Sequence, residues 1–466
     1  LPSLRRLDLR YSESLVRTPD FTGMPNLEYL NLEECCDLEE VHHSLGLCRK
    51  LIRLNLEFCG RLNWFPCVNV ESLEYLDLDF CCSLEKFPEI HGRMKPEIQI
   101  HMKRSGIREL PSSIFQYQTH ITFLDLSAMK NLVALPSSIC RLKSLVTVNV
   151  SGCTKLKSLP EEIGDLENLE ELYARYALIS RPPSTIVRLN KLKILKFGGL
   201  QDGVYFEFPP AAEGLRSLEH LDLSCCNLID GGLPEDIGCL SSLKELYLSG
   251  NNFEHLPQSI AQLGALRILN LRNCKRLTQL PELPPESDTI YADWSNDLIC
   301  NSLFQHISSV QHDISASDSL SLRVFTSVHL GKKPSWFLYQ GTDSGVSVNL
   351  PENWYIPDKF LGFALYYSGS LIDTTAQLIP VCDDGMSWMT QKLALSNHSE
   401  CDTKYNINFF LVPLAGLWDT SKANGKTPND YGLIRLSFSG EVKKYGLRLL
   451  YKEEPEVEGL VTNEGK

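Results

Sequence analysis

The strongest constraint on the fold of this 466-residue chain is a short leucine pattern that recurs through its first 284 residues. The pattern is leucine, two residues, leucine, one residue, leucine, with other apolar residues at some positions. A repeat of about 20 to 50 residues predicts a solenoid, because a short unit buries its apolar face only against its neighbours. The twelve units, spaced 22 to 26 residues apart, begin at Leu4, Leu27, Leu51, Leu73, Lys95, Ile121, Leu145, Leu169, Leu192, Leu218, Leu243 and Leu266.

Within each unit, the last two leucines and the residue between them predict a short strand whose leucines point inward. Stacked units then pair these strands into a parallel sheet on the concave side of a curved rod. That is the α/β leucine-rich repeat solenoid, an architecture suited to binding another macromolecule. The Lys95 unit is the most degenerate, and we expect it to keep only Ile98 and Ile100 of its three apolar positions.

Three residues after the last strand leucine, several units carry a small residue that is expected to point into the rod. A buried thiol or amide at that position can hydrogen-bond the neighbouring turn, whereas a charged group would be costly. The predicted structural ladder consists of Cys35, Cys59, Cys81, Cys153, Cys226, Asn251 and Cys274. The cysteine spacing shows no metal-binding pattern, and we expect neither a metal nor a cofactor. Sixteen cysteines without a disulfide framework predict a reducing compartment.

The second half of several units has a Leu-Pro followed by a short run that ends in isoleucine, as in LPSSI (110–114 and 135–139) and LPEEI (159–163). Proline suits the start of a helical turn on the convex side, and the isoleucine is expected to enter the core. The resulting CxxLxxLPxxIxxL pattern resembles the repeats of plant intracellular immune receptors that combine a TIR domain, a nucleotide-binding domain and leucine-rich repeats. Four longer segments resemble the same class: TPDFTGMPNLEYLNLEEC (18–35), EEVHHSLG (39–46), FPCVNVESLEYLDL (65–78) and RMKPEIQIHM (93–102).

The resemblance implies a module that binds a pathogen effector protein, viral proteins included, and relays binding to the receptor's own TIR and nucleotide-binding domains. The chain opens on Leu1 without methionine and contains no P-loop or TIR segment, so we expect a fragment without the NAD-cleaving activity of the class. Oligomerisation is expected only through the missing domains. The resemblance and the cysteine content imply a cytoplasmic or nucleocytoplasmic location.

Composition narrows the range of partners. Hydrophobic residues make up 43% of the chain, but no apolar run approaches the roughly 18 residues that would span a membrane. The net charge of −13 argues against nucleic acid as a direct partner. The scattered histidines, serines and carboxylates match no catalytic motif, so we expect no enzyme.

Four regions follow from the change in periodicity. Residues 1–284 are the repeat domain, and 285–312 are a linker or cap with a short helix at 298–307. Residues 313–455 are an all-β sandwich with strands near 324–330, 346–350, 361–367, 407–412, 433–438 and 447–451, and 456–466 are an acidic tail. The segments PSWFLYQGTDSGVSVNLPENW (334–354), KFLGFALYY (359–367) and KKYGLRLLYKE (443–453) resemble the C-terminal jelly-roll or Ig-like domain of the same receptor class.

The residue between the last two apolar positions of each unit is expected to face the concave side. In the first seven units this residue is small and polar or an amide, and we expect it to hydrogen-bond along the sheet and keep it soluble. These residues are Asp8, Asn31, Asn55, Asp77, Gln99, Asp125 and Asn149. From the eighth unit on, the face mixes aromatic, basic and acidic groups, and tyrosine and arginine often anchor interfaces. The candidate partner-binding residues are Glu171, Tyr173, Arg175, Lys196, His220, Tyr247 and Arg272.

Residues 198–214 break the repeat pattern and carry three aromatic residues, Tyr205, Phe206 and Phe208. They form either a recognition loop that inserts into a partner or a local packing cluster. Two other functions use the same concave face. One is a scaffold that binds a host protein, and the other is an extracellular receptor ectodomain, which would need a signal peptide and paired cysteine caps.

Overall fold

The computed structural model describes residues 1–451 except 116–119, 202, 212–213, 285–286, 288, 293–322, 328–338, 342–344, 382–387, 395–405 and 424. The chain forms two compact units, Leu1–Leu266 and Arg267–Lys466. The first contains the strands of the first eleven repeats, and the twelfth repeat strand belongs to the second. The sequence-based boundary at residue 284 stays a prediction.

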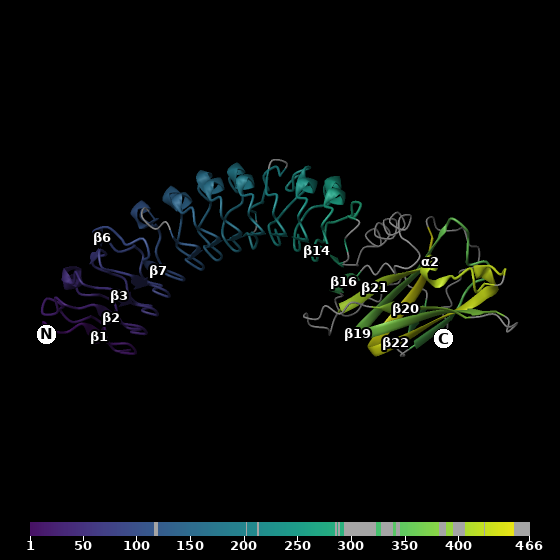
Figure 1. Cartoon of the computed structure of the whole chain (residues 1–466), viewed down its shortest axis with the longest axis horizontal. Coiled ribbons are helices and arrows are strands. Elements are labelled where there is room, and N and C mark those ends of the chain that lie inside the picture. Colours follow the sequence, from purple (N-terminus) through teal and green to yellow (C-terminus); the bar gives the residue numbers. More distant parts are fainter. Residues whose placement is uncertain are drawn as a thin grey trace. The chain divides into compact units, whose positions relative to one another are not determined.

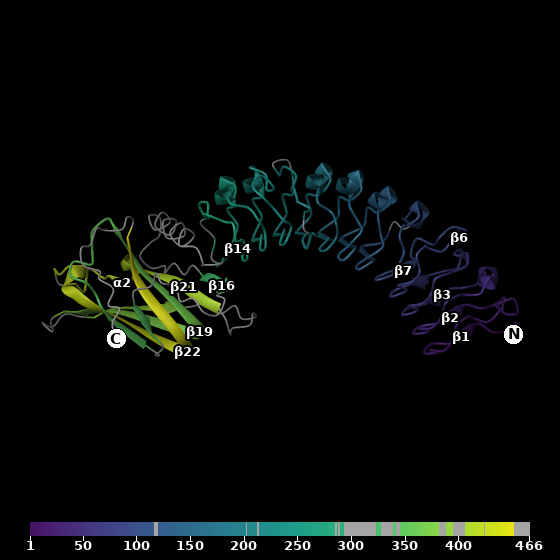
Figure 2. The same ribbon diagram turned by 180° about the vertical axis from the view of Figure 1, so that it is seen from behind.

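Parallel strands line the concave side of the first unit (Figures 1 and 2). Five of them pair in the order β1-β2-β3-β5-β7, and six pair in chain order from β8 to β13. The register is constant, so that Leu30 of one strand lies beside Leu54 of the next. The strand bounds are Arg6–Asp8 (β1), Tyr29–Asn31 (β2), Arg53–Asn55 (β3), Tyr75–Asp77 (β5), Gln99–His101 (β7), Phe123–Asp125 (β8), Thr147–Asn149 (β9), Glu171–Tyr173 (β10), Ile194–Lys196 (β11), His220–Asp222 (β12) and Glu245–Tyr247 (β13).

The core of the rod is built from the three apolar positions of each repeat. Leu54, Leu172 and Leu246 at the middle strand position are all fully buried. Burial of one such side chain contributes roughly 1.5–3 kcal/mol, and the contribution depends on the neighbouring repeat being folded. The sequence prediction of inward leucines in a parallel sheet is confirmed.

The fifth repeat differs from its sequence assignment. Ile100 pairs with Leu76 and therefore fills the second apolar position rather than the third. Ile98 fills the first position, and the third is filled by Met102, which is 1% exposed. The assignment missed the methionine because the first two apolar residues are one position closer together than in the other repeats. The central concave residue of this repeat is His101, and the expectation of Gln99 is wrong.

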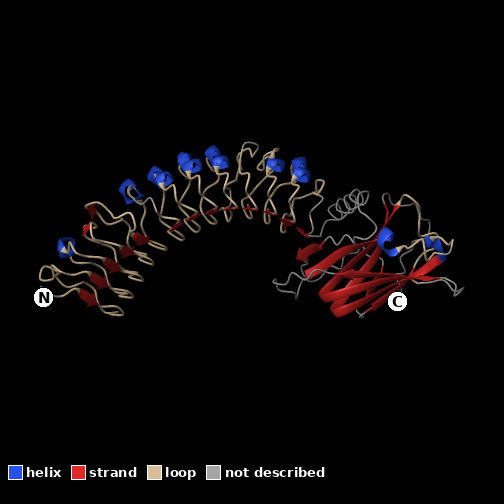
Figure 3. Cartoon of the chain, viewed as in Figure 1, coloured by secondary structure: helices blue, strands red, loops and turns tan. Residues whose placement is uncertain are grey.

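Short 3₁₀ helices lie on the convex side (Figure 3). Four of them have proline at the N-cap, three as the Leu-Pro motif predicted and the fourth as Pro183 of a Pro-Pro pair. Isoleucines such as Ile139 and Ile163 are fully buried beneath them. The helix bounds are His43–Leu47 (η1), Ser112–Phe115 (η2), Ser137–Arg141 (η3), Glu161–Asp165 (η4), Ser184–Arg188 (η5), Ile237–Cys239 (η6) and Gln258–Gln262 (η7). In the third and fourth repeats, two short parallel strands, β4 (Val68–Asn69) and β6 (Ile90–His91), pair with each other.

The second unit combines parallel and antiparallel strands. β14, β15 and β16 pair in parallel, and β16 then pairs antiparallel with β21. β15 lies inside the segment for which the sequence predicted a linker or cap. The strand bounds are Ile268–Leu271 (β14), Thr289–Ala292 (β15), Arg323–Ser327 (β16), Tyr339–Gly341 (β17), Gly345–Asn349 (β18), Phe360–Pro380 (β19), Met389–Ala394 (β20), Asn406–Pro413 (β21) and Tyr431–Tyr451 (β22), with helices Leu414–Leu417 (α2) and Pro428–Asp430 (η9).

Two 21-residue strands, β19 and β22, organise this β domain. They pair antiparallel along their length, and β-bulges shift the register at four places. The sequence predicted two separate strands at 433–438 and 447–451, because Gly440 between them is typical of a turn. That prediction is wrong, since the bulges absorb the irregular residues without ending the strand.

The core of the β domain lies around Trp354, which is 2% exposed. Its ring is 4.9 Å from that of Phe360 and 5.3 Å from that of Phe363 between centroids. The indole nitrogen donates to the carbonyl of Tyr431 at 2.8 Å, and the Tyr451 hydroxyl donates to the carbonyl of Trp354 at 2.6 Å. These bonds join the segment before β19 to both ends of β22.

Two sequence predictions, the helix at 298–307 and the acidic tail at 456–466, lie outside the described residues. Among the helices that are described, none has the length and apolar character needed to cross a membrane.

Candidate functional site

Each repeat presents four side chains to the concave face or to its edge. The first and third strand residues occupy concave positions one and two, and the two residues after the third apolar residue occupy positions three and four. In the eighth repeat these are Glu171, Tyr173, Arg175 and Tyr176. The intervening Leu172 and Ala174 are buried, as strand alternation requires. The seven candidate partner-binding residues lie at positions one to three, and none of them lies at position four.

Position four has a backbone conformation that recurs in all twelve repeats. Its φ is positive everywhere, as at Tyr11, Phe58 and Tyr176 (each 61°) and at Gly152 (77°). The reason is a hydrogen bond across repeats: the N–H of Phe58 donates to the carbonyl of Asp79 at 3.0 Å, and that of Tyr176 donates to Gly198 at 2.6 Å. Glycine adopts this conformation most readily, so a large side chain there is unusual.

The small polar residues at position two bond mainly within their own repeat, and the predicted bonding along the sheet is seen at Asn55. Their side-chain oxygens accept from the backbone N–H two residues later, as Asn55 does from Glu57 at 3.0 Å and Asn149 from Ser151 at 3.0 Å. These bonds fold the chain from the strand into the turn within one repeat. Asn55 also donates to the Glu33 carboxylate of the preceding repeat at 3.3 Å, so one bond along the sheet is present. Four repeats have a larger side chain at position two, which makes contacts other than this bond to the backbone. These side chains are His101, Tyr173, Lys196 and Tyr247.

Among the candidate partner-binding residues, Tyr173 is held by its own strand. Its hydroxyl donates to the Glu171 carboxylate at 3.1 Å, and the same oxygen accepts from Thr147 at 3.3 Å. Burial, followed by the charge and hydrogen bond of Glu171, raises the pKa of Tyr173. The Lys196 ammonium lies 5.8 Å from the centre of the Tyr173 ring. The ring is therefore half-buried and fixed in orientation before any partner binds.

Tyr247 repeats this arrangement three strands later. Its hydroxyl donates to Glu245 at 2.8 Å, and the same carboxylate oxygen lies 2.9 Å from Nδ1 of His220. Glu245 was missed in the sequence analysis. The signal was present, because the tripeptide Glu-Leu-Tyr occurs in both β10 and β13.

Arg175 follows β10 and contacts Asp222 of β12. Its guanidinium forms an ion pair with Asp222 at 3.4 Å and lies 5.6 Å from the centre of the Tyr176 ring. Its buried Nε has no hydrogen-bond partner within the described part of the chain. β10 to β13 thus bring together six of the seven candidates: Glu171, Tyr173, Arg175, Lys196, His220 and Tyr247. The seventh, Arg272, belongs to the second unit, where its guanidinium lies 4.5 Å from the Tyr291 ring centre.

The candidate insertion loop is mainly a packing element. Phe206 is 1% exposed and Phe208 is 3% exposed, and the Phe206 ring lies 5.1 Å from that of Phe197 between centroids. The alternative in which all three aromatic residues are displayed is therefore wrong for these two. Tyr205, at 56%, is exposed.

The cysteine ladder is buried and hydrogen-bonded. Four of its thiols donate to the carbonyl of the third apolar residue in the preceding repeat, as Cys59 does to Leu32 at 3.1 Å and Cys153 to Leu126 at 3.1 Å. Cys274 donates to the carbonyl of Arg272 in its own repeat at 3.8 Å. Burial raises the pKa of both thiols to about 12. Asn251 donates to the equivalent carbonyl of Leu223 at 2.9 Å. Thirteen cysteines in the described ranges are free thiols.

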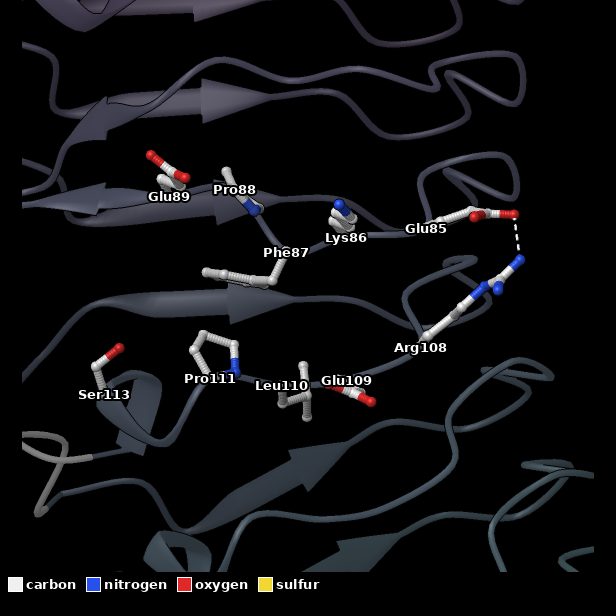
Figure 4. Close-up of a pocket in the computed structure, with 10 residues that line it drawn as sticks. All are labelled: Glu85, Lys86, Phe87, Pro88, Glu89, Arg108, Glu109, Leu110, Pro111 and Ser113. Atoms are coloured by element: carbon white, nitrogen blue, oxygen red, sulfur yellow. Dashed lines mark hydrogen bonds and ion pairs between the residues drawn. The ribbon is translucent and has the colours of Figure 1, made fainter.

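A hollow of about 530 Å³ lies beside the fourth and fifth repeats, away from the strands of the concave sheet (Figure 4). Phe87 and Pro88 lie on one side, and Leu110 and Pro111 lie on the other. Glu85 and Arg108 form an ion pair of 2.6 Å at one end. Single parallel bridges join repeats one to three and five to six at this level, whereas the fourth repeat turns into β6 instead. The lining carries three acids and two bases, so its charge favours no particular ligand.

Three family models match the chain. They are "C-JID domain" at residues 330–456, "Disease resistance protein RPS4B-like, leucine-rich repeats" at 69–158 and "Leucine rich repeat" at 216–275. The first falls on the β domain, and the other two fall on the repeats.

Two curated relatives show the extent of the similarity. TMV resistance protein N of Nicotiana glutinosa is 68% identical over 99% of this chain, which spans 43% of that protein. Disease resistance-like protein DSC1 of Arabidopsis thaliana is 35% identical over 60% of this chain, which spans 23% of that protein. The chain therefore corresponds to less than half of either relative. Among solved structures, a leucine-rich repeat protein of Leptospira interrogans covers 67% of this chain at 21% identity, with a TM-score of 0.30.

Proposed function

The chain carries leucine-rich repeats and a C-JID domain related by sequence to those of plant TIR–nucleotide-binding–leucine-rich-repeat disease resistance proteins, and we propose that it recognises a pathogen protein inside the plant cell. Binding would be relayed to TIR and nucleotide-binding domains outside this chain. The free cysteines of the described ranges suit the reducing cytoplasm.

The observation that carries the proposal is the arrangement of side chains on β10 to β13. Tyr173 and Tyr247 are half-buried, and each is held by a carboxylate two residues earlier. A fixed aromatic ring loses little entropy on binding, and tyrosine and arginine are enriched among the residues that dominate binding energy.

The name of the relative that is 68% identical refers to TMV, so proteins of tobacco mosaic virus are the first candidates for the partner. Each would be co-expressed with the chain and tested for co-purification. We expect one of them to bind, and the double substitution Tyr173→Ala with Tyr247→Ala to weaken binding by roughly 2–4 kcal/mol.

Phe123→Ala is the matched control, because Phe123 is a concave aromatic residue of β8 that is 60% exposed. It should leave binding unchanged. If Phe123→Ala abolishes co-purification while the tyrosine pair has no effect, the recognition surface is not on β10 to β13. To test the relay, the chain would replace the matching region of protein N, and cell death would be scored with and without the bound viral protein.

A further inference from the structure

The concave face of repeats two to four differs from the β10–β13 face and has no assigned role. At positions two to four it presents two aromatic residues and five acids, and we define these as the acidic–aromatic face. They are Glu33, Glu34, Glu57, Phe58, Asp77, Asp79 and Phe80.

The aromatic part is a stack of two rings. The centroids of Phe58 and Phe80 lie 4.2 Å apart at an interplanar angle of 20°. Both occupy position four, where φ is 61° and three of the eight later repeats have glycine (Gly152, Gly199 and Gly250). Phe58 is 38% exposed. Two aromatic rings at the edge of the sheet thus stand where glycine would adopt the positive φ more easily. The ring pair presents apolar surface to solvent.

The chain's own arginines show which group such rings attract on this face. The Arg104 guanidinium lies 5.2 Å from the Phe80 ring centre, at one end of the stack. The Arg53 guanidinium lies 3.9 Å from the Tyr75 ring centre, and the Tyr75 hydroxyl donates to Asp77 at 2.6 Å. A guanidinium is planar and weakly hydrated, so it stacks on aromatic rings better than an ammonium does.

The carboxylates of the acidic part accept hydrogen bonds, as Glu33 does from the Asn55 side chain at 3.3 Å. None of the five carboxylates forms an ion pair with any residue that the structure describes. Burial, followed by the charges of Asp77 and Glu33, raises the pKa of Glu57. Burial and the charge of Asp77 raise the pKa of Asp79 to about 6. In the same described ranges, no group of three or more acids, histidines or cysteines is close enough to hold a metal ion. The charges are therefore spread over three repeats, which suits an extended cationic segment.

We propose that the acidic–aromatic face binds an arginine-containing segment of a partner protein, with a guanidinium stacked beside Phe58 and further arginines paired with Glu57 and Asp79. The five acids supply charge complementarity, and the ring stack supplies the preference for arginine. This surface is separate from β10 to β13, so the proposal does not depend on which protein that face recognises.

The test uses the full 466-residue chain and a fluorescent nine-residue peptide that contains three arginines among glycine and serine. We expect measurable binding by anisotropy that weakens with salt, weaker binding of the lysine counterpart, and none of the peptide with citrulline in place of arginine. Phe58→Ala should weaken binding about tenfold, and Glu57→Gln with Asp79→Asn should weaken it at least as much.

Tyr176→Ala is the matched control, because Tyr176 also occupies position four with a φ of 61° but lies in the eighth repeat. It should bind as the unchanged chain does. If Phe58→Ala does not fold, Phe58→Leu keeps the apolar bulk and removes the ring, and several-fold weakening is expected. Four results would overturn the proposal: no binding by the folded chain, equal binding of the lysine and arginine peptides, unchanged affinity in the Phe58 variant, or equal losses at Phe58 and Tyr176.

Discussion

Asn251 shows how much one ladder residue contributes to the solenoid. It is 1% exposed and makes four hydrogen bonds, accepting from Cys226 and Leu228 and donating to Leu223 and Leu248. Asn251→Ala leaves these backbone groups without partners, so we expect a loss of roughly 2–4 kcal/mol in unfolding free energy. Asn251→Cys restores one donor, as at Cys153, and should lose less. Urea midpoints would measure both, and identical midpoints for the two variants would contradict this role.

Asp79 makes the stability depend on pH. Its folded pKa is about 6, above the ordinary value of 3.8, so the folded chain binds more protons than the unfolded chain between these values. Stability from this group is therefore present at low pH and is lost as the pH rises through 6. Asp79→Asn removes the charge and keeps an oxygen to accept from the Lys103 N–H.

We expect the free energy of unfolding of the Asp79→Asn variant to exceed that of the unchanged chain by on the order of 1 kcal/mol at pH 7.5, a figure reduced for solvent screening. At pH 4 the two free energies should be almost equal. Denaturation at the two pH values would measure this. Asp8→Asn is the control, because Asp8 lies 3.4 Å from Arg10 and outside the acidic–aromatic face. A gain that is equal at both pH values would show that the charge of Asp79 is not the cause.

At the scale of the element, β13 depends on Leu246, which is fully buried and paired with Leu221 of β12. Leu246→Asp buries a carboxylate without a partner and should cost several kcal/mol. Because each repeat is stabilised by its neighbours, hydrogen exchange should accelerate in β12 and β13 more than in β1 to β3. Ser249→Asp places the same charge at concave position three and should change little. Unaltered exchange in the Leu246 variant would contradict the assigned register.

The elements that the sequence predicted well are those in which one residue type repeats with a fixed period. The inward leucines place the repeat strands, and Leu-Pro places convex helices such as η3, η4 and η7. The assignment failed at the fifth repeat, where Met102 takes the place of a leucine. It also failed at Gly440, where a bulge continues β22 through a residue typical of turns. Local composition does not show whether a glycine ends a strand or is accommodated in a β-bulge, because the outcome depends on pairing with the neighbouring strand.

At the scale of the whole molecule, the candidate site was predicted only in part. Residue variety from the eighth repeat on identified Tyr173 and Tyr247, but not Glu245, which holds Tyr247 and contacts His220. The acidic–aromatic face was not predicted, because its aromatic residues lie at position four, whereas position two of the same repeats has small residues such as Asn31 and Asn55. Positions three and four lie in the turn, and position four has a positive φ that an aromatic residue in the sequence does not suggest.

The two compact units have separate cores, and this predicts separable responses to mutation. Leu447 is fully buried in the β domain, where β22 pairs it with Leu365 of β19. Leu447→Ala should cost about 2–5 kcal/mol through lost burial and a cavity. Hydrogen exchange should accelerate in β18, β19 and β22, while the amides of β1 to β5 keep their protection. Leu246→Asp should accelerate exchange in β12 and β13, while the amides of β18, β19 and β22 keep their protection. Simultaneous loss of protection in β2 and β22 in either variant would show that the two units unfold as one.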